Sequence, residues 1–294
     1  MGRIQELLAA DEANTRVTPQ LMKALHPWAV TAFDDTSSLY RLLYRALGDW
    51  PAEHAVDRGL HQLAEANRLS DDQLIELLKA GQANHIEGAA AAWQRLWMLK
   101  MVKYPVMACQ RYWSYGAAEL FRLHHTAALG YLRLEAESMA LVVLFFQDDA
   151  LAERWAHLTK ADAKKFFSET QPKIKAVLTQ CDLNNTYDIA SGSSQHVRMA
   201  GLVRSMMNNK PGQLSLPDQE FNIDDPYTFH LGIAHFHRIQ SRILGALGSV
   251  IPDVLTEEWV KQEKAFAENA AELWKTLERR YTNEIQEQAS GDTP

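Results

Sequence analysis

The chain has 294 residues, of which 47% are hydrophobic and 23% are charged, with 14 Gly, 10 Pro and 2 Cys. So few Gly and Pro residues exclude a low-complexity, collagen-like or turn-dense all-β chain, and two Cys residues exclude a disulfide framework. The net charge of -7 at pH 7 repels phosphate backbones on average, so nucleic acid is an unexpected partner unless a basic face is segregated.

Apolar residues recur at helical spacing along almost the whole chain, and no alternating pattern of convincing length indicates a strand. In the first part of the chain, helices are predicted over residues 36–49, from Pro51 onward, after the capping box Ser70–Gln73, and over residues 83–103. In the remainder they are predicted over residues 106–127, 129–147 and 150–157, from Thr159 onward, and over residues 171–181, 194–208, 227–248 and 256–287. Tyr104-Pro105 predicts an end or a kink after the helix over residues 83–103. The sequence therefore predicts an all-α, multi-helix bundle of about ten to twelve helices with no sheet.

The length permits one large domain or two of ordinary size. We expect an N-terminal helical region over residues 1–104, which can pack on the rest, and a main helical bundle over residues 105–294. The last predicted helix carries one apolar stripe, made of Trp259, Phe266, Ala270, Leu273, Leu277, Tyr281 and Ile285. Such a stripe is typical of a helix that docks on a core or pairs with a partner helix, and a homodimer is the expected assembly.

The first residues lack a basic start followed by an apolar stretch, so no secretory signal is expected. The longest apolar run, residues 139–146, is too short to span a bilayer. We therefore expect a cytoplasmic protein with no membrane partner.

Two charged residues, Arg133 and Glu137, lie four positions apart in a predicted helix that is otherwise rich in Leu, Ala, Val and Phe. If that helix is central, both charges are buried and must pair with each other, with another polar group or with a ligand. Loss of Glu137 would then cost roughly 3 kcal/mol, because Arg133 would be left without its partner. Glu119 and Arg122 form a similar couple on the preceding predicted helix.

A second polar segment, residues 187–196, concentrates hydroxyl groups and an imidazole at a predicted helix start, where free backbone N–H groups favour an anion. A folded chain can bring Tyr187, Ser191 and His196 together with the Arg133 helix in one polar pocket. Internal ion pairs beside a serine-rich helix cap are the structural alternative. We interpret the chain as a ligand-binding or protein-interaction module with a buried Arg/Glu/His site, a small-molecule ligand and no cofactor.

An enzymatic alternative rests on Asp148, Asp149 and Glu153, which follow two phenylalanines in a pattern that resembles the metal-binding motif of class I terpene synthases. That resemblance implies a Mg²⁺ cofactor and a lyase that acts on an isoprenoid diphosphate. The second metal motif of that family is not present in this sequence. The structural alternative is that Asp148 and Asp149 cap the next helix, so the sequence leaves open whether the protein is an enzyme.

The histidines His230, His235 and His237 do not have the spacing that one metal ion requires on a helix. We therefore expect core or surface histidines rather than metal ligands.

Three further features occur together: the Arg133-x-x-x-Glu137 helix, the segment Ala152-Glu153-Arg154-Trp155, and the series Tyr187, Ser191 and His196. Over about residues 130–200 the chain thereby resembles uncharacterised bacterial all-helical proteins that are thought to be related to the HEPN group. HEPN domains are often dimeric and often tied to RNA or to defence systems. The resemblance implies a helical fold and, as a third interpretation, an RNA-acting protein that uses Arg133, Glu137 and His196. The Arg-to-His spacing of HEPN ribonucleases is not present, so the resemblance supports the fold more than a nuclease activity.

Overall fold

The computed structural model describes residues 27–122, 124–184, 226–251 and 255–291, together with Glu12 and Pro19. Within these ranges every regular element is a helix, which confirms the all-α prediction. In chain order the elements are α2 (Pro27–Gly48), α3 (Pro51–Ala66), α4 (Asp71–Lys79), the 3₁₀ turn η1 (Ala83–His85), α5 (Ala89–Met101), α6 (Lys103–Phe121), α7 (His125–Gln147), α8 (Asp149–Ala156), α9 (Ala163–Gln180), α12 (Pro226–Val250) and α13 (Glu257–Gly291). None of the helices in these ranges combines the length and the apolar character needed to cross a bilayer.

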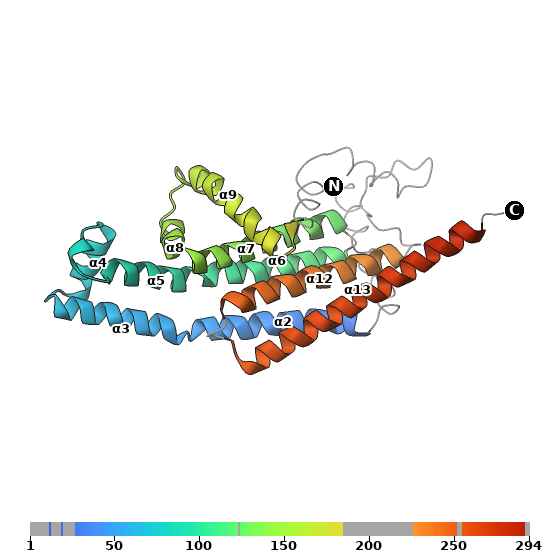
Figure 1. The fold of residues 1–294 in the computed structure, drawn as a ribbon, viewed down its shortest axis with the longest axis horizontal. Helices are drawn as coiled ribbons and strands as arrows, with labels where there is room; N and C mark the ends of the chain where they lie inside the picture. Colours follow the sequence, from blue (N-terminus) through green and yellow to red (C-terminus); the bar gives the residue numbers. More distant parts are fainter. Residues whose placement is uncertain are drawn as a thin grey trace.

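The described helices enclose two hydrophobic cores. The larger core draws buried side chains from α2, the last turn of α5, α6, α7, α8, α9, α12 and α13. The smaller core draws them from α3, α4, η1 and the rest of α5. Figure 1 shows an elongated bundle with α4 at one end and the C-terminal end of α13 at the other. Since α2 belongs to the larger core, the two cores do not coincide with a division at residue 104.

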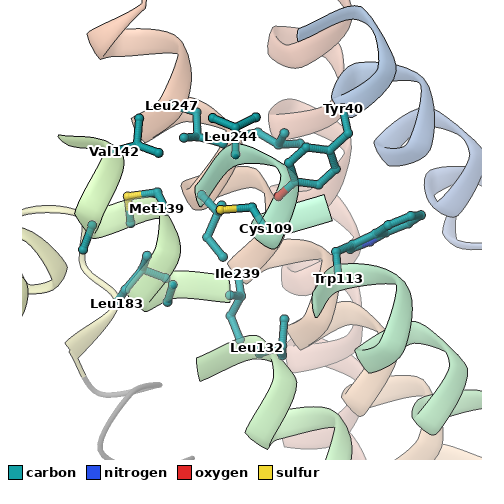
Figure 2. Packing of buried hydrophobic residues seen from close by; sticks show 14 of the residues in the cluster. Tyr40, Cys109, Trp113, Leu132, Met139, Val142, Leu183, Ile239, Leu244 and Leu247 are labelled. Carbon is teal, nitrogen blue, oxygen red and sulfur yellow. The ribbon is translucent and has the colours of Figure 1, made fainter. Parts of the chain in front are cut away.

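Helix α7 lies at the centre of the larger core. It packs against α6 on one side and against α12 and α9 on others. Figure 2 shows Leu132 and Met139 of α7 beside Cys109 of α6 and Ile239 of α12. The helix that carries Arg133 is therefore central to the bundle.

Several helix boundaries follow from local chemistry, as predicted. Pro51 is the first residue of α3, and Ser70 forms a complete capping box with Gln73 at the start of α4. The break expected at Tyr104-Pro105 occurs slightly earlier, because α5 ends at Met101 and α6 begins at Lys103. Pro105 has no N–H to donate to the carbonyl one turn before it, so the helical hydrogen bonding is interrupted at this point.

Residues 159–181 form fewer helices than the sequence predicts. The sequence predicts separate helices from Thr159 and over 171–181, but the structure has the single helix α9, with Pro172 inside it. Its buried residues Phe166, Ile174 and Val177 lie on one side, and α9 packs against α7, so the packing of this stripe offsets the hydrogen bond that Pro172 lacks. The predicted total of ten to twelve helices is in this respect too high. The helix predicted over 194–208 lies outside the described residues.

Candidate functional site

The predicted pair Arg133 and Glu137 is formed on α7. The Nε and Nη2 atoms of Arg133 donate to Oε1 of Glu137 at 3.2 and 3.1 Å. The side chain of Arg133 is 15% exposed and that of Glu137 is 23% exposed, so the ion pair lies at the edge of the core and water reaches it. It is partly buried, rather than enclosed as the sequence led us to expect.

The second predicted couple lies where α6 ends and α7 begins. Glu119 accepts a hydrogen bond from Arg122 at 2.9 Å through one oxygen and contacts Nδ1 of His124 at 2.7 Å through the other. Its two oxygens therefore join the last turn of α6 to the first residue before α7. Tyr187, Ser191 and His196 lie outside the described residues, so their meeting with Arg133 stays a prediction.

The sequence analysis did not single out a third carboxylate, Glu135. It lies between Arg133 and Glu137 in the sequence, and its side chain is fully buried in the fold. The hydroxyl of Tyr40 on α2 donates to Oε1 of Glu135 at 2.5 Å, and Nε2 of Gln240 on α12 donates to that same hydroxyl at 2.9 Å. Cys109 on α6 completes the surroundings, since its thiol donates to the backbone carbonyl of Glu135 at 3.5 Å. We call Tyr40, Glu135 and Gln240 the polar triad; its members come from three helices and Figure 2 shows Tyr40 among the packed core residues.

Burial decides the charge of the triad. It raises the pKa of Glu135 from 4.5 to about 8, against the lowering effect of the hydrogen bond from Tyr40 and of the nearby Gln240 amide. Glu135 Oε2 and Gln240 Oε1 are both buried and accept no hydrogen bond from any residue that the structure describes. Protonation removes the charge of Glu135, which is the part of this carboxyl that burial penalises most. The raised pKa favours the neutral form of Glu135 near pH 7, and its contacts with Tyr40 and Cys109 link α7 to α2 and α6.

A periodic signal for Glu135 does exist in the sequence. Leu132, Glu135, Met139 and Val142 follow helical spacing and form the inner stripe of α7, whereas Arg133 and Glu137 lie on a neighbouring face. The spacing of four residues drew attention to the outer pair. The partners of Glu135 are 95 residues away in the case of Tyr40, so no local pattern indicates them.

The three carboxylates of the magnesium alternative each have a structural partner. Asp148 caps α8 by accepting from the backbone N–H of Leu151 at 3.3 Å. Asp149 pairs with Arg95 at 3.4 Å, and Glu153 accepts from the indole N–H of Trp93 at 3.1 Å. The contacts of Asp149 and Glu153 hold α8 against α5, and together with the cap by Asp148 they favour a capping and packing role at this place.

Of the three histidines of α12, His230 and His237 are buried in the core and His235 is half-buried. The Nε2 of His237 donates to the carbonyl of Ala29 at 2.9 Å, and its ring lies among Trp28, Phe33 and Phe266. Burial lowers the pKa of His237 from 6.5 to about 4, and burial together with nearby Arg238 does the same for His235. In the part of the chain that the structure describes, no three His, Cys, Asp or Glu side chains gather as a metal site would require.

Comparison of the chain with protein-family models, with curated proteins and with solved structures finds no match. The resemblance to HEPN-related helical proteins therefore stays a prediction.

Proposed function

We propose that the chain is a cytoplasmic protein-interaction module that forms a homodimer through the C-terminal end of α13. The observation that carries this proposal is the length of α13 relative to the helix on which it packs. Helix α13 has 35 residues and α12 has 25. At 1.5 Å per residue, α13 is longer by about 15 Å.

The first part of α13 is bound to the bundle. Trp259, Phe266, Leu273 and Leu277 are buried, and the indole N–H of Trp259 donates to the carbonyl of Leu39 on α2 at 3.1 Å. Helix α13 packs on α12 and on α2. This first part therefore has a covered apolar stripe and needs no partner.

The apolar stripe continues in the sequence beyond the part that packs. After Leu273 and Leu277, the same spacing gives Tyr281 and Ile285, whose side chains are outside the described part of the structure. Figure 1 shows the C-terminal end of α13 extending past the other labelled helices. An apolar stripe on a helix of this kind is stabilised by a second apolar helix.

The charges around this stripe favour a second copy of the same chain as the partner. Arg279 and Arg280 precede Tyr281, whereas Glu284 lies about one turn and Glu287 nearly two turns after it. When two copies of the segment pair antiparallel, the arginines of each face the glutamates of the other. A two-fold symmetric interface is self-complementary in this way.

The oligomeric state in solution tests the proposal. We expect the purified chain, at about 50 μM, to have twice its chain mass of 33.3 kDa by light scattering after gel filtration. The double variant Tyr281→Glu with Ile285→Glu is expected to have the mass of one chain, because two charges cannot be buried in the seam.

The matched control is Lys275→Glu, which changes the net charge by the same amount at an exposed position off the stripe. It is expected to remain dimeric. A wild-type chain with the mass of a monomer at this concentration would refute the proposal, and so would a double variant that stays dimeric.

A further inference from the structure

A surface pocket lies between α2, α5 and α6, apart from the polar triad and from the end of α13. Its volume is about 330 Å³. The residues that line it are Tyr44, Lys100, Met101, Lys103, Tyr104 and Met107. This volume is at the small end of the range for ligand sites, and two of the lining side chains are aromatic.

The apolar side chains of this pocket are unusually open to solvent. Tyr44 is 43% exposed, Tyr104 is 53% exposed and Met107 is 40% exposed, although all three are large and hydrophobic. Single exposed hydrophobic residues are ordinary, but three that line one pocket indicate a contact surface. Tyrosine and methionine are also the residue types that recur at recognition surfaces.

The ring of Tyr104 has a fixed support. Its centroid is 6.4 Å from that of Trp155 on α8, and Trp155 lies 5.6 Å from Phe145 in the larger core. This series of rings runs from the core to the pocket. Tyr104 therefore presents its ring from a rigid base, which lowers the entropy that binding would cost.

The charges of the pocket are mainly positive. Residues 100–111 contain three cations and no carboxylate, and residues 41–53 contain Arg41 and Arg45 with Asp49 and Glu53. Glu53 is already paired with Lys103 at 2.5 Å.

The remaining cations of the two segments are Arg41, Arg45, Lys100 and Arg111, and none of them forms an ion pair with another described residue. Lys100 lines the pocket, and Arg41 and Arg45 flank Tyr44 on the exposed side of α2. Arg111 is exposed one turn beyond Met107 on α6. In these two segments, four cations without an ion pair to a described residue thus stand against one such carboxylate, Asp49, near two exposed tyrosines of a chain whose net charge is -7.

We propose that this pocket binds a nucleotide unit, a planar base joined to a phosphate, either free or as part of a single strand. The base stacks on Tyr104 and Tyr44, whose π faces accept any base. The phosphate is held by Lys100, with Arg41, Arg45 and Arg111 at the rim as further contacts to a strand. An acidic peptide would satisfy the cations but would leave the exposed tyrosine rings without a planar partner.

Fluorescence anisotropy tests the proposal with a labelled single-stranded RNA of about ten nucleotides. We expect binding that weakens as salt is raised, and competition by unlabelled AMP but not by inorganic phosphate at the same concentration. Direct calorimetry with AMP then separates the two sources. Affinity for AMP equal to that for the strand assigns a free nucleotide, and tighter binding of the strand assigns nucleic acid.

Substitutions at the pocket separate stacking from charge. Tyr104→Ala is expected to weaken binding at least about fivefold, whereas Tyr104→Phe, which keeps the ring, retains it. Lys100→Gln is expected to weaken binding of both the strand and AMP. The matched control is Tyr115→Ala, which removes an exposed tyrosine of the same helix outside the pocket and is expected to change nothing.

Three results would overturn the proposal. In the first, neither the strand nor AMP binds at about 1 mM ligand. In the second, Tyr104→Ala binds as tightly as the wild type, and in the third, a polyglutamate peptide competes as effectively as AMP. Because Tyr104 and Lys100 are at the surface, an unchanged thermal transition in each variant verifies that the fold is retained.

Discussion

The three ionisable residues of one turn of α7 have different environments although they are neighbours in sequence. Arg133 and Glu137 pair at the edge of the core and keep some exposure, whereas Glu135 points into the core and meets Tyr40. A rotation of about 100° per residue on a helix separates the two directions. The charged pair therefore remains in reach of water, and the fully buried residue is the one that is stable as a neutral acid.

Partial exposure reduces what the ion pair contributes to stability. With Glu137→Ala, Arg133 loses this partner but keeps access to water, so we expect a loss of about 1 to 2 kcal/mol instead of the roughly 3 kcal/mol of a fully buried pair. Urea denaturation measures this loss.

The matched comparison is Glu76→Ala, which breaks the exposed surface pair with Lys79 on α4 and is expected to cost less than about 0.5 kcal/mol. Equal losses for the two variants would show that the environment of Arg133 does not differ from the surface.

These residues show which contacts of the candidate site could be predicted from the sequence and which could not. Contacts between residues three or four apart, such as Arg133 with Glu137 and Glu119 with Arg122, follow from helical spacing, and the structure forms both. The polar triad could not be predicted, because Gln240 and Tyr40 are 200 residues apart and only the packing of α12 on α2 brings them together.

At the scale of whole helices, local chemistry fixes where several elements begin. The capping box at Ser70, the proline at the start of α3 and the aspartate before α8 were all visible in the sequence. The length of α9 was not visible, because Pro172 locally favours a break and the contact with α7 overrides it. Helix ends that depend on a distant surface cannot be read from local residues.

The cap of α8 makes a prediction at the scale of this helix. Asp148→Ala removes the acceptor for the N–H of Leu151 and is expected to lower the free energy of unfolding by about 1 kcal/mol, whereas Asp148→Asn keeps a capping oxygen and costs much less. Thermal unfolding of both variants distinguishes them. If the asparagine variant loses as much stability as the alanine variant, the charge of Asp148, which lies 3.7 Å from Lys173, matters more than the cap.

At the scale of the whole molecule, the larger core is assembled from helices that are distant in sequence. Helix α2 contacts α12 and α13, which follow it by about two hundred residues, through Tyr40 with Gln240, Ala29 with His237, and Leu39 with Trp259. Each of these contacts uses a buried polar group, so α2 is positioned by hydrogen bonds as well as by apolar packing. The contact of Tyr40 adjoins the titratable Glu135, and the contact of Ala29 is made by the titratable His237. The stability of this core therefore depends on pH.

The buried titratable groups have opposite effects on stability. The folded pKa of Glu135 is about 8 and its ordinary value is 4.5, so between these values only the folded chain holds the proton and stability falls as the pH rises. The folded pKa values of His235 and His237 are about 4 and their ordinary value is 6.5, so in that window only the unfolded chain holds the proton and stability rises with pH.

These three groups together predict a stability maximum at about pH 6.5, because two histidines outweigh Glu135 below that pH and Glu135 acts alone above it. Each net proton changes the free energy of unfolding by up to about 1.4 kcal/mol per pH unit. Urea denaturation between about pH 5 and pH 8 measures the profile. Glu135→Gln is expected to remove the decline above the maximum, and His237→Gln, which keeps a donor for Ala29, is expected to flatten the rise below it. If both variants keep the wild-type profile, groups at the surface control the pH dependence, and the buried residues that join α2, α7 and α12 do not.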